Sequence, residues 1–310
     1  MLLVDSWPCG HTTRVVNRWR LAMTAAAVGV AVALAACAPA QPVATPAPSE
    51  AFSTTSPPRG LSASLVQYRR DQPRRFVEVK LANAGAAALD VTLLDVTLPG
   101  FTDTGPVDRS TTLEADRRVD LPVPLGDPVC DQPTDGGAVA QVEVATDSGG
   151  SVRTKVPVDD DGLLTRLHGF DCAVRRAEEV TDITLTPDWT RRGEGRDLTV
   201  AGEVDVRLTD PSATVEITDV AGNLLFVAVP ESVTPPPPVR LDDTTTSATI
   251  GFELLPARCD GHAIAEAKRL TTVAFMVAVD GTESVPIRKA PDDAGFDTLI
   301  RALNERCAAL

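Results

Sequence analysis

The sequence predicts an all-β protein in which two tandem β-sandwich domains follow a signal peptide and a disordered linker. Apolar and polar residues alternate with a period of two along most of the chain, which is the pattern of half-buried strands. A second observation is that one arrangement of strands, turns and cysteines occurs twice. The predicted segments are a signal peptide over 1–36, a linker over 37–60, and domains over 61–176 and 177–310.

The N-terminal segment has the pattern of an export signal. The stretch from Leu21 to Ala36 carries no charge and follows Arg14, Arg18 and Arg20. Basic residues followed by a short apolar run are typical of a secretory signal peptide. The run is shorter than the roughly 20 residues that a membrane-spanning helix needs.

The end of this run resembles the lipobox of bacterial lipoproteins. Its residues are Leu34, Ala35, Ala36 and Cys37. The resemblance implies that the thiol of Cys37 receives a diacylglyceryl group and that a peptidase then cuts before it. We therefore expect a protein anchored by its N-terminal lipid to the extracytoplasmic face of the cell membrane. The alternatives are an ordinary secretory signal with a chance cysteine, or an uncleaved membrane helix.

The segment from Ala38 to Gly60 is rich in Pro, Ala, Ser and Thr and shows no apolar periodicity. Such a composition cannot bury enough apolar surface to offset the entropy of ordering, so it predicts a disordered tether. Its length would span roughly 25 Å as a flexible coil and about 70 Å when extended.

The charge and the aromatic content argue against nucleic acid as a partner. The formal net charge is −14, and beyond Cys37 the chain has only Trp189, Tyr68 and eight Phe as aromatic residues. An acidic surface repels phosphates, and binding of single strands needs exposed aromatic rings together with positive charge. Sugar binding by stacked rings is disfavoured for the same shortage of aromatic residues.

The repeat covers 124–172 and 253–307. Each copy begins near a Cys-Asp pair and continues with a strand, a Gly-containing turn, a second strand, an acidic cluster, a leucine-rich turn and a final Cys. This shared order indicates duplication of one module.

The end of the second copy changes from strand to helix periodicity. Phe296, Leu299, Ile300 and Leu303 fall on one face of a helix. Asp292 and Asp293 precede that face and are placed to cap it. In the first copy, the leucines at 163, 164 and 167 predict a shorter version of this element, so we expect each domain to end in a short helix or turn.

Further strands precede each Cys-Asp pair. Alternating stretches cover 62–68, 76–85, 89–98 and 117–125 in the first copy, and 182–187, 197–208, 213–229 and 246–254 in the second. Many short strands at this spacing predict an antiparallel sandwich of the immunoglobulin-like type in each half. Four consecutive prolines at 235–238 indicate an inserted loop, because proline has no N–H for a sheet.

The whole chain resembles two-domain secreted lipoproteins of actinobacterial type. The resemblance rests on the lipobox, the cysteine pattern and the stretch RCDGHAIAEAKR from Arg258 to Arg269. This stretch is similar to a Cys-Asp-Pro-His-Ala-x-Ala-Glu-Asp-Lys-Arg motif of such proteins, from which it departs at Gly261 and Ala267. The first copy has neither the His nor the Lys of this stretch. The resemblance implies no established activity.

Four cysteines remain after export and lipidation: Cys130, Cys172, Cys259 and Cys307. An even number in an exported domain indicates two disulfides, and four cysteines allow three pairings. Duplication favours a bond within each repeat, Cys130 with Cys172 and Cys259 with Cys307. Free thiols, or bonds that join the two domains, are the alternatives.

The sequence contains no recognisable catalytic or metal motif. His168 and His262 do not correspond in the repeat, and we expect a structural or solvent-exposed role for each. The run Asp159-Asp160-Asp161 lacks the alternate spacing of a calcium loop and is interpreted as helix capping. We expect no enzyme activity, no metal and no cofactor.

One charged cluster remains as a possible binding spot. On a helix, His262 and Glu266 would lie one turn apart, with Lys268 nearby. A solvated turn is the simpler interpretation. The leading hypothesis is a membrane-tethered binding or scaffolding protein of the cell envelope, with an unidentified protein or ligand as its partner. The alternatives are an envelope hydrolase or transferase, or a solute-capturing lipoprotein of a transporter.

Overall fold

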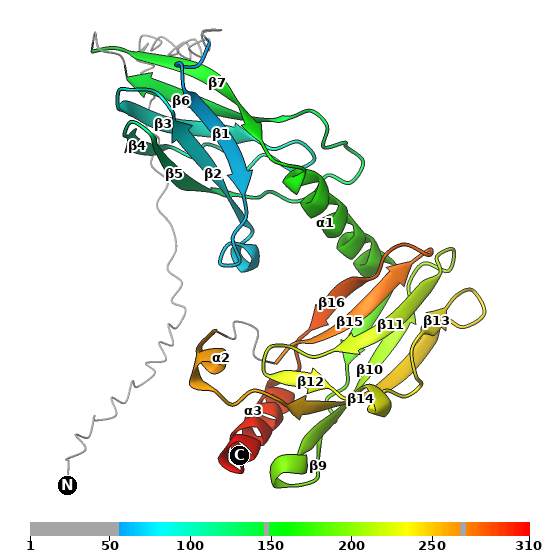
Figure 1. Cartoon of the computed structure of the whole chain (residues 1–310). Helices are drawn as coiled ribbons and strands as arrows, with labels where there is room; N and C mark the ends of the chain where they lie inside the picture. The colour runs from blue at the N-terminus through cyan, green and yellow to red at the C-terminus, as the bar shows by residue number, and fades with distance from the viewer. Residues whose placement is uncertain (1–55, 146–148, 267–270) are drawn as a thin grey trace, which may run out of the picture. The chain divides into compact units, whose positions relative to one another are not determined.

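The structure is a computed structural model that describes residues 56–145, 149–266 and 271–310. These residues form mostly β-strands, together with three α-helices (Figure 1). Contacts group the chain from Ala51 to Leu310 into one compact unit. The predicted all-β class is therefore confirmed.

The first half forms one seven-stranded sheet with the order β4-β3-β6-β7-β1-β2-β5. Its strands are β1 (Leu61–Val66), β2 (Phe76–Asn83), β3 (Leu89–Thr97), β4 (Arg109–Leu113), β5 (Arg117–Pro124), β6 (Ala138–Ala145) and β7 (Ser151–Asp159). All neighbours are antiparallel except β1 and β7, which run parallel and pair Ala63 with Val158. The alternating pattern that predicted the strands places every second side chain of β6 in the core.

The second half forms two sheets. Its strands are β8 (Thr181–Leu185), β9 (Thr190–Arg192), β10 (Thr199–Leu208), β11 (Val215–Ala221), β12 (Phe226–Ala228), β13 (Val239–Leu241), β14 (Ser247–Pro256), β15 (Val273–Val279) and β16 (Val285–Lys289). One sheet has the order β12-β14-β10-β8, with β9 also paired to β10, and the other has the order β13-β11-β15-β16. Both sheets contribute side chains to a single hydrophobic cluster, in which Phe252 of β14 lies edge-on to Phe275 of β15.

The strand orders of the two halves correspond. The run β4-β3-β6-β7 matches β13-β11-β15-β16, and β1-β2-β5 matches β8-β10-β14. A β-bulge also recurs. The register shifts between Leu93 and Asp95 of β3 and between Ile217 and Asp219 of β11. In each bulge the aspartate side chain accepts a hydrogen bond of 2.8 Å from the next backbone N–H.

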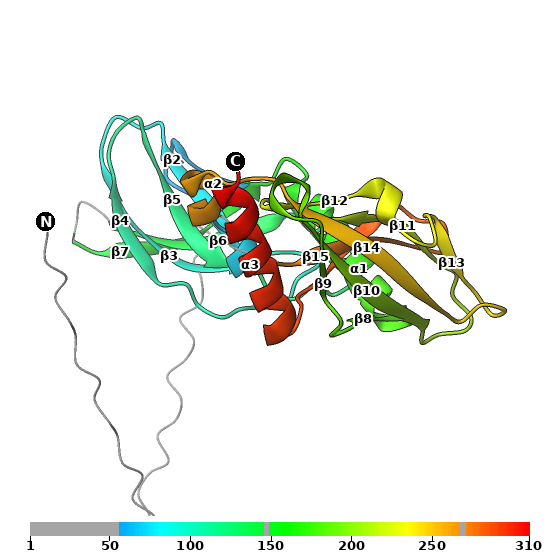
Figure 2. The same ribbon diagram turned by 90° about the horizontal axis from the view of Figure 1, so that it is seen from below.

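One long helix follows the last strand of each half. Helix α1 (Leu163–Val180) comes after β7, and α3 (Asp293–Ala308) comes after β16. The predicted cap of α3 is confirmed, since Asp292 accepts a hydrogen bond from the N–H of Gly295 at 2.8 Å. Helix α3 packs against β9, β10 and β14 (Figure 2).

The helix before Cys172 is much longer than the short helix or turn that the sequence predicted. Helix α1 has 18 residues and continues past the predicted domain boundary at 176/177. Its first turn buries Leu164 in the cluster of the first half, and its last turn buries Ala177 and Val180 in the cluster of the second half. The helix is longer than the pattern suggested because its two ends pack against different cores, so no single apolar stripe marks its length.

The two disulfides pair as the duplication predicted. Cys130 is bonded to Cys172 with the Cα atoms 5.6 Å apart, and Cys259 is bonded to Cys307 with the Cα atoms 5.3 Å apart. Each bond ties the segment after β5 or after β14 to the helix that ends the repeat. The free-thiol and cross-domain alternatives are thereby excluded.

We expect the double variant Cys130→Ser/Cys172→Ser to lose about 3 kcal/mol of unfolding free energy, because the cross-link restricts the unfolded chain. Urea denaturation of the exported protein under oxidising conditions measures this loss. Non-reducing peptide mapping of the same variant should still find Cys259 bonded to Cys307. An unchanged urea midpoint would contradict the prediction.

Candidate functional site

The predicted binding cluster lies at α2 (Gly261–Glu266), which begins two residues after Cys259. His262 is exposed on this helix. Asp260 accepts a hydrogen bond of 2.8 Å from the N–H of Ala263, and this bond lowers the pKa of Asp260. Lys268 and the side chain of Glu266 lie outside the described residues, so the contact between His262 and Glu266 stays a prediction. Cys37, the predicted site of lipidation, also lies outside the described residues.

His168 lies on α1 and packs beside the first disulfide. Its ring is edge-on to Phe101, with ring centroids 5.7 Å apart. Its Nε2 atom lies 3.1 Å from the carbonyl oxygen of Val129 and 3.6 Å from Sγ of Cys172. These contacts hold the ring against the loop that carries Cys130, so His168 contributes to the packing of α1.

The acidic run before α1 accepts hydrogen bonds from backbone N–H groups at the start of that helix. The carboxylate of Asp160 accepts hydrogen bonds from the N–H groups of Gly162 at 3.0 Å and Leu164 at 3.2 Å. Negative charge at this end also suits the helix dipole. In the part of the chain that the structure describes, no three His, Cys, Asp or Glu side chains are grouped to hold a metal ion.

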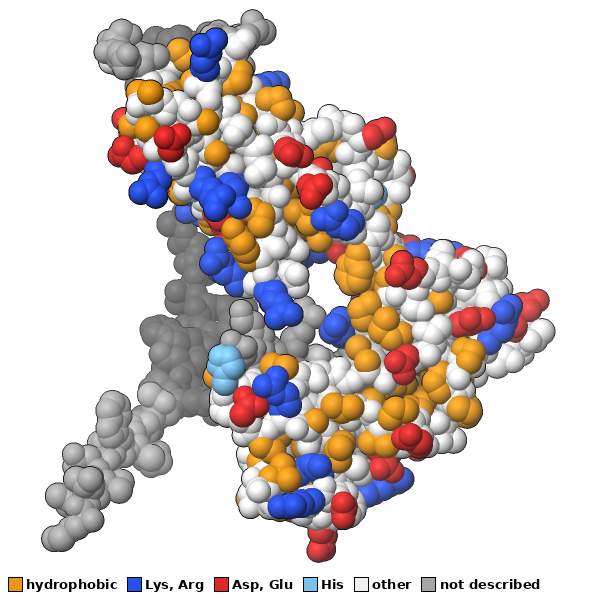
Figure 3. All heavy atoms as spheres, viewed as in Figure 1, with side chains coloured by type: hydrophobic (Ala, Val, Ile, Leu, Met, Phe, Trp, Pro, Cys, Tyr) orange, Lys and Arg blue, Asp and Glu red, His pale blue; other side chains and the backbone are white. Residues whose placement is uncertain are grey.

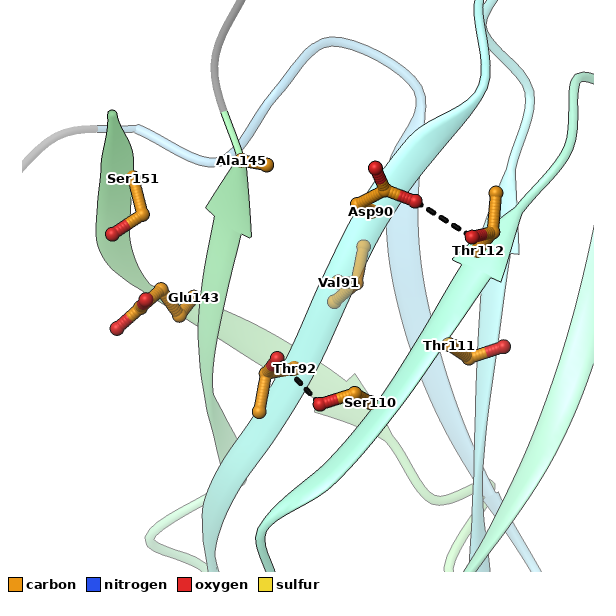
Figure 4. A pocket seen from close by; sticks show the side chains of 9 residues that line it. All are labelled: Asp90, Val91, Thr92, Ser110, Thr111, Thr112, Glu143, Ala145 and Ser151. Carbon is orange, nitrogen blue, oxygen red and sulfur yellow. Dashed lines mark hydrogen bonds between the residues drawn. The ribbon is translucent and has the colours of Figure 1, made fainter. Parts of the chain in front are cut away.

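A shallow polar hollow of about 480 Å³ lies on the outer surface of β3, β4, β6 and β7 (Figure 4). Two hydrogen bonds between side chains of β3 and β4 cross this hollow. Thr112 donates to Asp90 at 2.6 Å, and Thr92 and Ser110 lie 2.9 Å apart. Because its polar groups already bond one another, the hollow offers few unsatisfied groups for a ligand.

Glu143 borders this polar hollow. Arg153 donates a hydrogen bond of 2.7 Å to its carboxylate. This bond, together with one from Ser151, lowers the pKa of Glu143 below its ordinary value. The carboxylate therefore stays charged in mildly acidic conditions.

A larger hollow of about 680 Å³ lies beside α1, and we call it the α1 hollow. Its lining comes from the β1–β2 loop, from the residue that follows β5, from α1 and from β16, which lies along α1. The lining residues are Gln67, Gln72, Pro73, Arg75, Leu125, Leu167, Phe170, Asp171, Pro286 and Arg288. Figure 3 shows hydrophobic side chains next to Lys and Arg side chains in this region.

The β1–β2 loop is held in shape by a buried aspartate. Asp71 is fully buried, and its carboxylate accepts a hydrogen bond of 3.1 Å from the N–H of Tyr68. The guanidinium groups of Arg70 and Arg74 each lie 3.6 Å from the same carboxylate. The short 3₁₀ helix η1 (Gln72–Arg74) follows, and the next residue, Arg75, has a left-handed backbone with φ of 53°.

Arg75 joins the loop to α1. Its Nη2 atom donates to the carbonyl oxygen of Gly126 at 2.8 Å and lies 3.0 Å from the carboxylate of Asp171. The carboxylate of Asp171 is largely buried, with 16% of its side chain exposed. An ion pair in this partly buried position is screened less than a surface pair and holds both side chains in place.

Sequence reasoning missed the α1 hollow, although one signal for it was present. Residues 69–75 contain four arginines in a chain whose formal charge is −14. In the structure, most of these arginines lie beside carboxylates, and one of them, Arg75, lines the hollow. The other lining residues come from distant segments and could not be grouped from their spacing.

Comparison with known proteins identifies no family. No protein-family model matches the chain, and no curated protein resembles it in sequence. A red sea bream transglutaminase aligns at 10% identity with a TM-score of 0.20, over 76% of this chain, which spans only 31% of that enzyme. The YadV chaperone aligns at 14% identity with a TM-score of 0.20. The alignment covers 74% of this chain and 98% of the chaperone. A Porphyromonas gingivalis W83 protein of unknown function aligns at 14% identity with a TM-score of 0.21. The alignment covers 69% of this chain and 89% of that protein. Scores of this size carry no argument about fold or function.

We expect Arg153→Ala to raise the pKa of Glu143 toward its ordinary value, which is about 4.3. A lowered carboxyl pKa stabilises the fold above the pKa of the unfolded chain, and this gain is lost as pH falls through the folded pKa. NMR titration of the Glu143 carboxyl measures both values. Equal values in the wild type and the variant would show that Arg153 has no such effect.

Proposed function

We propose that the chain is a lipid-anchored binding or scaffolding protein on the extracytoplasmic face of the cell membrane. The lipobox residues from Leu34 to Cys37 and the proline-rich tether support the anchor. In the described residues, no helix has the length and apolarity needed to cross a membrane. In the proposal, Cys37 carries the lipid, and the part after Gly60 is held close to the membrane.

The observation that carries the proposal is the pair of disulfides, Cys130–Cys172 and Cys259–Cys307. Disulfides persist in oxidising compartments outside the cytoplasm and are rare in most cytosolic proteins. Their presence supports export of the folded part, which is what the signal segment predicts.

We propose two immunoglobulin-like sandwich domains, over 61–176 and 177–310. Three features support this division: the matched strand order, the bulge at Asp95 and Asp219, and one disulfide in each half. In the second half, Ala177 is part of the hydrophobic cluster, and Ala173 and Val174 of α1 pack against it from before the proposed boundary.

A binding role fits the described surface better than catalysis. His168 is packed against Phe101 and the Val129 carbonyl, and no carboxylate is among these contacts. The polar hollow on β3 and β4 contains neither histidine. An envelope hydrolase or transferase would need a nucleophile with a base within hydrogen-bond reach.

A second candidate function is the capture of a small solute for a transporter. The α1 hollow favours it, because its size falls within the range of about 300–1,000 Å³ that is usual for small-molecule sites. This candidate keeps the same lipid anchor and the same tether.

Replacement of Cys37 by Ala tests the anchor. Without the thiol no diacylglyceryl group can be attached, so we expect the protein to leave the membrane fraction or to accumulate as the uncleaved precursor. Cell fractionation with mass measurement of the N-terminal peptide distinguishes these results. A variant that is cleaved and retained in membranes as the wild type is would overturn the anchor.

A further inference from the structure

We infer that the disulfide Cys130–Cys172 is a site of thiol–disulfide exchange, at which a small organic thiol opens the bond while Cys259–Cys307 stays closed. The thiol is the reductant and is itself oxidised to a disulfide. The inference goes beyond the proposed binding role and does not depend on the lipid anchor.

Cys130 is the accessible end of this bond. It is exposed in the loop after β5, whereas each of the other three disulfide-bonded cysteines is partly buried. The rate of exchange depends on which sulfur an attacking thiolate can reach. The exposure therefore directs the attack to Cys130 and makes Cys172 the leaving group.

The leaving sulfur has a histidine beside it. Nε2 of His168 lies 3.6 Å from Sγ of Cys172 and 3.1 Å from the carbonyl oxygen of Val129. Since a carbonyl oxygen only accepts hydrogen bonds, Nε2 carries a hydrogen, and this N–H group can also donate to a thiolate at Cys172. Stabilisation of the leaving thiolate speeds exchange, because a thiol of lower pKa leaves faster.

The imidazole ring is held in this position before a thiol arrives. It lies edge-on to Phe101, with ring centroids 5.7 Å apart, and α1 carries both His168 and Cys172 one turn apart. A donor that is already in place needs no rearrangement when the negative charge develops on sulfur.

The second disulfide has apolar surroundings at the corresponding place. The position four residues before Cys307 holds Leu303, which is 3% exposed in the core of the second half. Cys307 packs against the same hydrophobic cluster. Apolar surroundings disfavour a thiolate, so we expect Cys259–Cys307 to resist exchange.

The exchange takes two steps. In the first, a thiolate attacks Sγ of Cys130, a sulfur–sulfur bond joins the two, and the bond to Cys172 breaks with its electron pair on Sγ of Cys172. In the second, another thiolate attacks the sulfur of the attached thiol and releases Cys130 as a thiolate. Each cysteine takes up a proton from water, to which each attacking thiol gave one. Two thiols thereby become one disulfide, and their two electrons reduce the disulfide of the protein.

Opening this bond also changes the support of α1. Cys172 lies in the middle of the helix, where the disulfide fixes it to the loop after β5. Exchange therefore loosens α1 in the first half, while the second disulfide continues to hold α3.

The experiment treats the folded, oxidised full-length protein with 2-mercaptoethanol for increasing times and then blocks free thiols with N-ethylmaleimide. Non-reducing peptide mapping measures the mercaptoethanol and maleimide adducts at each cysteine. We expect Cys130–Cys172 to open at least about tenfold faster than Cys259–Cys307. At early times mercaptoethanol should be attached to Cys130 and maleimide to Cys172.

Variants at His168 separate its effect on the sulfur from its packing. His168→Leu introduces the residue type that the second repeat has at this place, and we expect it to slow the opening of Cys130–Cys172 about tenfold. His168→Gln keeps a side-chain N–H donor and should retain more of the rate. If His168 acted only by packing, its removal would loosen α1 and speed the opening.

His262→Leu is the matched control, because it makes the same change at an exposed histidine of the second half and should leave this rate unchanged. Urea denaturation of the oxidised proteins shows which variants are folded. Three results would overturn the inference: opening of Cys130–Cys172 that is no faster than that of Cys259–Cys307, mercaptoethanol attached first to Cys172, or opening that is not slowed in folded His168→Leu. The first two are measured on the wild-type protein and do not require that a variant folds.

Discussion

The disulfide in each repeat is the constraint on which the helices depend. Helix α1 has 18 residues, but only Leu164, Ala177 and Val180 are buried. Between them, Leu167, Ala173 and Val174 are only partly buried, so apolar burial stabilises the middle of the helix less than its ends. Cys172 lies in that middle part and fixes it to the loop after β5, where His168 adds contacts with Phe101 and Val129. In the second repeat, Cys307 fixes the last turn of α3, where fraying would otherwise be expected.

The placement of α1 also creates the candidate binding region. The face that leaves Phe170 exposed borders the β1–β2 loop, and Arg75 from that loop reaches Asp171 on the helix. The buried Asp71 keeps this loop in the shape that presents Arg75. The packing of α1 therefore determines both the contact of the helix with two hydrophobic clusters and the lining of the α1 hollow.

The two halves share details of backbone structure that a common origin by duplication explains. The aspartates at 95 and 219 each satisfy the N–H of the following residue at the same bulge. A bulge bends its strand and increases the local twist. The bulge, the strand order and the position of the disulfide are common to both halves, so their strands are arranged in the same way. The halves differ in one respect: the first half joins its strands into one sheet by pairing β1 with β7.

The sequence by itself determined the strands with clear alternation, such as β10 and β15, the cap of α3 at Asp292, and the pairing of the cysteines. These features depend on residues close in sequence, or on the repeat. The strand β4 was missed, because its residues, RSTTL, show almost no apolar alternation.

Tertiary structure alone decided the length of α1 and the existence of the α1 hollow. The two ends of α1 pack on different cores, and the lining of the hollow comes from four segments that are far apart along the chain. Local periodicity reports only which face of one element is buried. It carries no information on which distant side chains meet, since that depends on how the sheets and the helix pack.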